Sequence, residues 1–157
     1  MTPPGFALFR NDRQFDVVDK EKGGGVCFLI NEVWCMDTKV VSTSCTPELE
    51  SLTVKCRPFY LPREFGSVIL TVAYIPPEVN AMSAIDQLSN IVTRIENANP
   101  GAISIVAGDF NHANLKKGLP KYYQHVKCPT RNNKILDHSY STIKNAYKSL
   151  KRTPLGD

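Results

Sequence analysis

The sequence has no apolar run long enough to cross a membrane, and its first residues, MTPPGFALFRNDRQ, lack the apolar core of a secretory signal. It has no CxxC pair, and its cysteines are odd in number: Cys27, Cys35, Cys45, Cys56 and Cys128. These spacings argue against a disulfide framework and against a zinc site. Internal repeats and low-complexity tracts are also missing. We therefore expect an intracellular protein, nuclear or cytoplasmic, with reduced thiols and no membrane partner.

Chain length limits the number of domains, and the distribution of charge indicates the class of partner. A chain of 157 residues fits a single domain, which can bury roughly two-thirds of the surface of its unfolded form. Residues 1–111 carry 9 Lys and Arg against 13 Asp and Glu, whereas residues 112–157 carry 10 against 2. The basic C-terminal third favours a polyphosphate or nucleic-acid partner, although lysines scattered over a solvated surface would give the same count.

The hydrophobic pattern predicts strands in the first half of the chain and one helix after them. Strand patterns cover residues 26–33, 39–44, 49–57 and 67–75. Residues 81–97 carry apolar side chains at three- and four-residue spacing, which predicts a helix with Asn80 as its N-cap. A strand over 103–107 then completes a strand–helix–strand crossover.

The two ends of the chain are less regular. Residues 1–24 read as loop, and beyond the crossover we expect a helical patch at 120–125 with strands at 126–128 and 135–143. Residues 144–157 are basic and contain no predicted element. The order of elements predicts an α/β (α+β) domain of mostly antiparallel strands packed as two sheets.

The segment Ala102–Asn111, AISIVAGDFN, is the most informative stretch for function. A short apolar run ends at Gly108, and Asp109 and Asn111 follow on either side of Phe110. Residues i and i+2 of an extended chain point to the same side, so these two polar side chains can address one point. A carboxylate beside a carboxamide suits a hard cation or a phosphoryl oxygen. A polar turn that closes a core strand is the simpler alternative.

Three further places could carry chemistry at the ends of predicted strands. The phenol of Tyr74 could donate a hydrogen bond to a phosphoryl oxygen, or the ring could simply close the edge of the core. Alternation along ILDHSY puts Asp137 and His138 on opposite faces, so Asp137 could orient a histidine from another strand, while His138 receives no role. Thr130–Asn132 form a turn that could contact phosphate, which is a weak signal.

These motifs together resemble the endonuclease/exonuclease/phosphatase superfamily. They stand here as Tyr74-Ile75-Pro76, Gly108-Asp109-Phe110-Asn111 and Leu136-Asp137-His138. Over nearly the whole chain, the sequence is similar to the endonuclease domain of non-LTR (LINE-type) retrotransposons. The similar segments are GGGVCFLINEVWC, ELESLTVKCRPFYLPREF and LPKYYQHVKCPTRNNKILDHSYSTIKNAYKS.

The resemblance implies a four-layer αββα sandwich and a DNA-nicking phosphodiesterase that uses Mg²⁺ or Mn²⁺, with DNA as partner. It implies that Asp109 aligns or activates the attacking water, that Asn111 helps to bind the scissile phosphate, and that both residues bind the metal. It implies that Tyr74 hydrogen-bonds the phosphate and that Asp137 orients a histidine. It implies no organic cofactor, and we expect a monomer. A phosphatase acting on a small phosphorylated substrate shares the fold and is the less favoured alternative.

The same resemblance predicts that parts of the family's site are missing. A strand bearing an Asn and a strand ending in a metal-binding Glu should come before Met1, and a Ser-Asp-His triplet should come after Asp157. Glu21 and Glu32 stand in the wrong context to replace that Glu. We therefore expect residues 1–157 to be an incomplete sandwich that is inactive alone, or a catalytically dead remnant whose basic third binds nucleic acid weakly. Metal-dependent cleavage by this chain would require another carboxylate, Glu32 or Glu50, to hold the metal.

Overall fold

The computed structural model describes residues 1–14, 16 and 24–153. Its elements in chain order are β1 (Phe6–Asn11), β2 (Val26–Asn31), β3 (Asp37–Cys45), β4 (Glu50–Arg57), β5 (Ser67–Tyr74), α1 (Ala81–Ala98), β6 (Ala102–Asp109), the 3₁₀ helix η1 (Leu115–Lys117), β7 (Tyr123–Gln124) and β8 (Asp137–Ser141). Strands β1 and β2 form a two-stranded sheet, and the other six form a sheet with the order β3-β4-β5-β6-β8-β7. All neighbours are antiparallel except β5 and β6, which are parallel. The predicted pair of mostly antiparallel sheets is confirmed.

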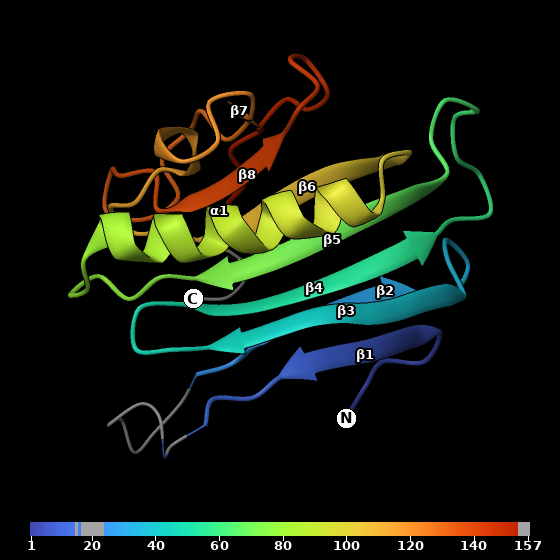
Figure 1. Ribbon diagram of the computed structural model, residues 1–157, viewed down its shortest axis with the longest axis horizontal. Helices are drawn as coiled ribbons and strands as arrows, with labels where there is room; N and C mark the ends of the chain where they lie inside the picture. The colour runs from blue at the N-terminus through green and yellow to red at the C-terminus, as the bar shows by residue number, and fades with distance from the viewer. Residues whose placement is uncertain (15, 17–23, 154–157) are drawn as a thin grey trace.

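Helix α1 makes the parallel pairing of β5 and β6 possible, because parallel neighbours need a long crossover. Asn80 caps it as predicted: its side-chain oxygen accepts hydrogen bonds from the backbone N–H groups of Met82 at 2.9 Å and Ser83 at 3.2 Å. Figure 1 shows α1 lying across β5 and β6 on one face of the six-stranded sheet. Within the described residues, no helix combines the length and the apolarity that crossing a bilayer requires.

Two apolar clusters hold the layers together, one on each face of the six-stranded sheet. The first packs between α1 and the sheet and includes Leu88, Val106, Phe110 and Tyr140, all essentially inaccessible to solvent. The second packs between the two sheets and includes Val26, Ile30, Leu52, Val54 and Cys56. We call the face of the larger sheet that meets β1 and β2 the inner face. The β1–β2 sheet contacts β3, β4 and β5.

Strand β1 contradicts the prediction that residues 1–24 are loop. Its inward positions, Ala7, Phe9 and Asn11, alternate with Phe6 and Leu8, which point outward and are partly exposed. Apolar side chains on both faces hide the two-residue period, so the strand is recognisable only from its pairing with β2.

The segment after β6 was also predicted wrongly. Residues 120–125 contain the short strand β7 instead of a helical patch, and residues 126–128 are not a strand. The helical turn lies earlier, at η1, where the Asn114 side chain caps the backbone N–H of Lys116 at 2.9 Å. Pairing with β8 at the edge of the sheet holds β7 in place, and a two-residue strand has no pattern of its own.

Candidate functional site

The register of the large sheet places polar side chains in one row at the ends of four strands. Glu50 on β4 is paired with Tyr74 on β5, Tyr74 with Asp109 on β6, and Asp109 with Asp137 on β8. Residues in register on neighbouring strands project from the same face, which here is the inner face. Three of the four residues singled out in the sequence therefore lie side by side. We call Glu50, Tyr74, Asp109 and Asp137 the polar row.

Asn111, the fourth predicted residue, is joined to the row by the turn that follows β6. Its φ of 49° lies in the left-handed region, which asparagine tolerates better than most residues. Its backbone N–H donates to Asp109 Oδ1 at 3.1 Å, and its Nδ2 donates to the carbonyl of Ile75, which follows β5, at 2.8 Å. The turn thus fixes the Asn111 carboxamide beside the Asp109 carboxylate.

A hairpin ahead of β8 brings a positive charge to the row. The backbone N–H of Lys134 donates to the carbonyl of Arg131 at 2.8 Å, and Asn132 and Asn133 between them have φ values of 50° and 59°. Two central residues with positive φ define the tight turn that joins hairpin strands. The Arg131 guanidinium donates from Nη2 to Asp109 Oδ2 at 2.7 Å. Both oxygens of the Asp109 carboxylate are therefore engaged.

Thr130 fastens this hairpin to the strand that carries Asp137. Its Oγ1 accepts hydrogen bonds from the backbone N–H groups of Leu136 at 3.0 Å and Asp137 at 3.1 Å. A cavity of about 440 Å³ opens beside it, lined by Pro77, Asn111, His112, Asn132, Lys134, Ile135 and Leu136. The turn that was a weak signal in the sequence thus supplies one wall of a cavity next to Asn111.

His138 lies on the opposite face of the sheet, as the alternation along ILDHSY predicted. Its ring stacks on Phe110 with 5.1 Å between centroids and 7° between planes. Nε2 lies 3.0 Å from the Ile135 carbonyl, so Nε2 carries the proton and Nδ1 accepts from the Tyr140 hydroxyl at 2.6 Å. These contacts use both ring nitrogens, and His138 is part of the packing under α1.

Buried His125 and half-buried His138 predict that the protein loses stability in mild acid. Burial lowers the pKa of His138, against smaller opposing effects of the Ile135 carbonyl and of Asp137 and Asp109, and burial also lowers the pKa of His125. Near pH 6.5 the unfolded chain binds more protons at these two histidines than the folded chain does, so the free energy of unfolding falls as the pH drops through that value. We expect a lower urea midpoint at about pH 5.5 than at about pH 7.5.

The double variant His125→Gln/His138→Gln serves as the control for this prediction. It removes both groups and is expected to flatten the pH dependence in that window. A wild-type midpoint that is the same at the two pH values would contradict the assignment of neutral, buried rings.

The described residues do not fit a divalent metal ion by themselves. No three His, Cys, Asp or Glu side chains among residues 1–14, 16 and 24–153 come together as a metal-binding group. Asp109, the carboxylate predicted to bind metal, already contacts the Arg131 guanidinium. Glu50 is also occupied, because its carboxylate forms an ion pair with Arg13 and accepts the Gly25 backbone N–H at 2.7 Å. Glu21 lies outside the described residues, and Glu32 follows the end of β2.

Comparison with known proteins gives matches in structure only. No protein-family model and no curated protein matches the sequence. A solved structure of an endonuclease/exonuclease/phosphatase family protein from Bacteroides thetaiotaomicron is similar, with a TM-score of 0.58 and 11% identity over 88% of this chain and 61% of that one. The present chain has the endonuclease/exonuclease/phosphatase fold.

Two other neighbours share the endonuclease/exonuclease/phosphatase fold and were solved with bound groups. TDP2 of D. rerio, complexed with single-strand DNA product, gives a TM-score of 0.56 and 11% identity over 92% of this chain and 65% of that one. The human Nocturnin catalytic domain with bound sulfate anion gives 0.54 and 14% over 88% and 60%. The chain therefore spans about three fifths of the length of the solved structures it matches.

Two contacts of the site were not foreseen from the sequence. Arg131 belongs to the Thr130–Asn132 turn, which the sequence indicated only as a possible phosphate contact. Nothing in the local sequence indicated that it contacts Asp109, 22 residues away. Arg13 pairs with Glu50 across 37 residues. The only local hint was that Glu50 begins an otherwise apolar strand, where an unpaired carboxylate would be costly.

Proposed function

We propose that this chain is a phosphodiester-hydrolase domain of the endonuclease/exonuclease/phosphatase fold, of the DNA-endonuclease type found in LINE-type retrotransposons. We further propose that residues 1–157 alone bind nucleic acid without cleaving it. The observation that carries the proposal is the register of Tyr74, Asp109 and Asp137 on three neighbouring strands, with Asn111 bonded to Asp109. Tyr74 and Asp109 are 35 residues apart in the sequence, and Asp109 and Asp137 are 28 apart, yet all three lie at the same end of the sheet. Their proximity supports a common role in one functional site.

Each of these side chains suits a step of in-line displacement at phosphorus. Negative charge builds up on the phosphoryl oxygens, and the Tyr74 hydroxyl is a donor that could bind one of them. Asn111 is held through Nδ2, which leaves its carboxamide oxygen in a fixed place beside Asp109. Asp109 would align the attacking water. Asp137 would orient a phosphate-facing histidine, a position that His138 does not take because its ring packs under α1.

The state of Asp109 supports binding without cleavage. A carboxylate that bonds a guanidinium at 2.7 Å is a weaker acceptor for a water proton than a free one. The developing charge at phosphorus also needs a strong local cation, and the described residues assemble no set of donors that would hold one. Lys134 supplies positive charge at the cavity and Arg131 supplies it beside Asp109, which favours binding of a phosphate backbone.

Nicking of supercoiled plasmid tests the catalytic half of this proposal. We expect the chain, shown to be folded by its cooperative unfolding, to give no more nicking in Mg²⁺ or Mn²⁺ than Asp109→Ala does. Nicking that requires the metal, stops in EDTA and is lost in Asp109→Ala would contradict the proposed inactivity and would instead establish the endonuclease.

Fluorescence anisotropy with a labelled single-stranded oligonucleotide tests the binding half. We expect the affinity to fall steeply between about 50 mM and about 200 mM salt, because backbone contacts release counterions. Arg131→Gln/Lys134→Gln should reduce the slope of log K against log salt by about one unit and weaken binding roughly tenfold at the lower salt. Arg94→Gln, which removes an exposed charge from α1, is the matched control and should bind as the wild type does. Equal loss in both variants would contradict a role for the Arg131 hairpin.

A further inference from the structure

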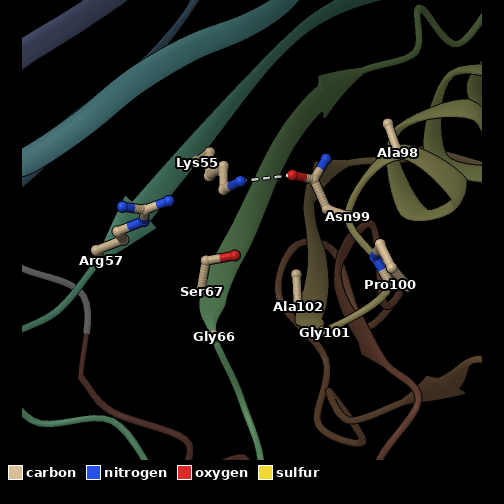
Figure 2. A pocket seen from close by; sticks show the side chains of 9 residues that line it. All are labelled: Lys55, Arg57, Gly66, Ser67, Ala98, Asn99, Pro100, Gly101 and Ala102. Carbon is tan, nitrogen blue, oxygen red and sulfur yellow. Dashed lines mark hydrogen bonds between the residues drawn. The ribbon is translucent and has the colours of Figure 1, made fainter.

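A second cavity lies at the opposite end of the same strands. It has a volume of about 260 Å³ and is bounded by the last residues of β4, the first residues of β5 and β6, and the segment that follows α1 (Figure 2). Ser67 starts β5 and Tyr74 ends it, so this cavity and the polar row lie at opposite ends of a strand about 23 Å long. What binds here is therefore remote from the polar row and does not depend on the function proposed for it.

The charge of this cavity is positive. Lys55 and Arg57 both line it, and no acidic residue does. Lys55 Nζ donates to Asn99 Oδ1 at 2.6 Å, which holds the ammonium group at the cavity while its other hydrogens are free to bind a ligand. The Asp37 carboxylate, whose Oδ2 lies 4.0 Å from Arg57 Nε, lines a smaller hollow together with Arg57.

A third cation adds to the repulsion at this place. Lys39 on β3 lies directly opposite Lys55 in the antiparallel register and lines the smaller hollow with Lys55 and Arg57. Like charges directly opposite each other destabilise a sheet, and a bound anion would offset that cost. The arrangement is therefore better suited to an occupied cavity than to an empty one.

Ser67 provides the second, independent observation. The residue is 4% exposed, and Figure 2 shows its hydroxyl directed into the space among Lys55, Arg57 and Asn99. Among the described residues, no side-chain hydrogen bond involves Ser67 Oγ, and this oxygen is not one of the fully buried, unpartnered hydroxyls, so it is open to the cavity that Ser67 lines. The Ser67 hydroxyl can therefore donate a hydrogen bond to an acceptor inside the cavity.

We propose that this cavity binds the phosphate group of a small phosphomonoester. Three kinds of donor converge on it: an ammonium, a guanidinium and a hydroxyl, which together suit a tetrahedral oxyanion. A phosphomonoester can enter end-on and place its terminal oxygens on Ser67 and Lys55, whereas a nucleic-acid backbone would have to continue on both sides of the phosphate. Pro100 and the Gly66–Gly101 backbone bridge, N to O 2.8 Å, form the wall that a substituent would contact.

Calorimetric titration with inorganic phosphate, and separately with deoxyadenosine 5′-monophosphate, tests the proposal. We expect saturable binding of both probes to the wild type and a loss of at least about tenfold in affinity for Lys55→Gln/Arg57→Gln. Ser67→Ala removes one hydroxyl oxygen that has no partner in the fold, and it should weaken binding several-fold without altering the urea midpoint. It keeps the test decisive if the double variant does not fold.

One control variant separates this site from the polar row. Arg131→Gln/Lys134→Gln should bind phosphate as the wild type does, since Lys134 lines the other cavity and Arg131 contacts Asp109 of the polar row. Binding that survives Lys55→Gln/Arg57→Gln and Ser67→Ala, or that is lost in Arg131→Gln/Lys134→Gln instead, would overturn the proposal. So would the absence of saturable binding of either probe to the wild type, whatever the nicking and oligonucleotide experiments show. Tighter binding of the labelled oligonucleotide than of both small probes, abolished by Lys55→Gln/Arg57→Gln, would overturn the choice of a small phosphomonoester.

Discussion

Replacing Gly108 by alanine is expected to remove a large part of the stability of the fold. Gly108 has a φ of 148°, and a Cβ built on it would stand 1.8 Å from the carbonyl oxygen of Ala73 on the neighbouring strand. The two residues are in register in the parallel pair β5–β6, so the clash lies in the centre of the sheet and involves backbone that cannot move aside. The expected loss is about 3 kcal/mol or more, a large part of the stability of a domain this size.

Urea unfolding followed by circular dichroism measures this loss, and Gly101→Ala is the matched control. A Cβ at Gly101 would come no nearer than 4.0 Å to a neighbouring backbone atom, so that variant should keep nearly the wild-type midpoint. If Gly108→Ala and Gly101→Ala unfolded at the same urea concentration, the close approach of β5 and β6 at the polar row would be wrong.

The second large effect is expected from Glu50→Ala. The Glu50 and Arg13 side chains are 3% and 6% exposed and form an ion pair, and Glu50 Oε2 also accepts the Gly25 N–H. Removal of the carboxylate leaves the Arg13 guanidinium buried without its counter-charge, which typically costs about 3–5 kcal/mol. The guanidinium also lies over the Tyr74 ring, 5.9 Å from its centroid, so the change is expected to disturb the polar row.

Two variants show whether the buried charge is the cause. Glu50→Gln keeps the shape and an acceptor for the Gly25 N–H, and should lose less stability than Glu50→Ala. Arg10→Ala breaks the exposed pair with Asp12, whose side chains are 61% and 63% exposed, and should change the urea midpoint little. A Glu50→Ala midpoint close to that of Arg10→Ala would show that Arg13 and Glu50 are solvated and unpaired in solution.

The parts of the fold that could be predicted from the sequence are those with a local period. β5, α1 and β6 have long apolar patterns, a capping asparagine and clear terminators, and their bounds agree with the prediction to within two residues. The strand ends that carry Tyr74 and Asp109 were therefore visible, whereas the crossover allowed either a parallel pair or a connection between sheets, and the structure shows the parallel pair. The prediction that Asp137 and His138 face opposite ways also needed nothing but alternation, and it is confirmed.

The parts that could not be predicted depend on pairing across the sheet. β1 has apolar residues on both sides, and β7 is two residues long, so each is defined by its partner strand. The Arg13–Glu50 and Arg131–Asp109 pairs join residues far apart in the chain, and the sequence does not indicate which arginine pairs with which carboxylate. These two pairs decide whether Glu50 and Asp109 are free to bind other groups, and only the folded chain shows that both carboxylates are taken.

The order of strands in the large sheet has a consequence for how the polar row forms. From β3 to β6 each strand is the spatial neighbour of the one before it in the chain, and β8 then adds to the free edge of β6. During synthesis the row can therefore be built in one direction, from Glu50 to Tyr74, then Asp109, then Asp137, with every new strand meeting an edge that already exists. Register errors are confined to the newest strand. A slip of β8 by one residue would put His138 on the inner face and turn Asp137 away, so this last pairing decides whether the row is complete.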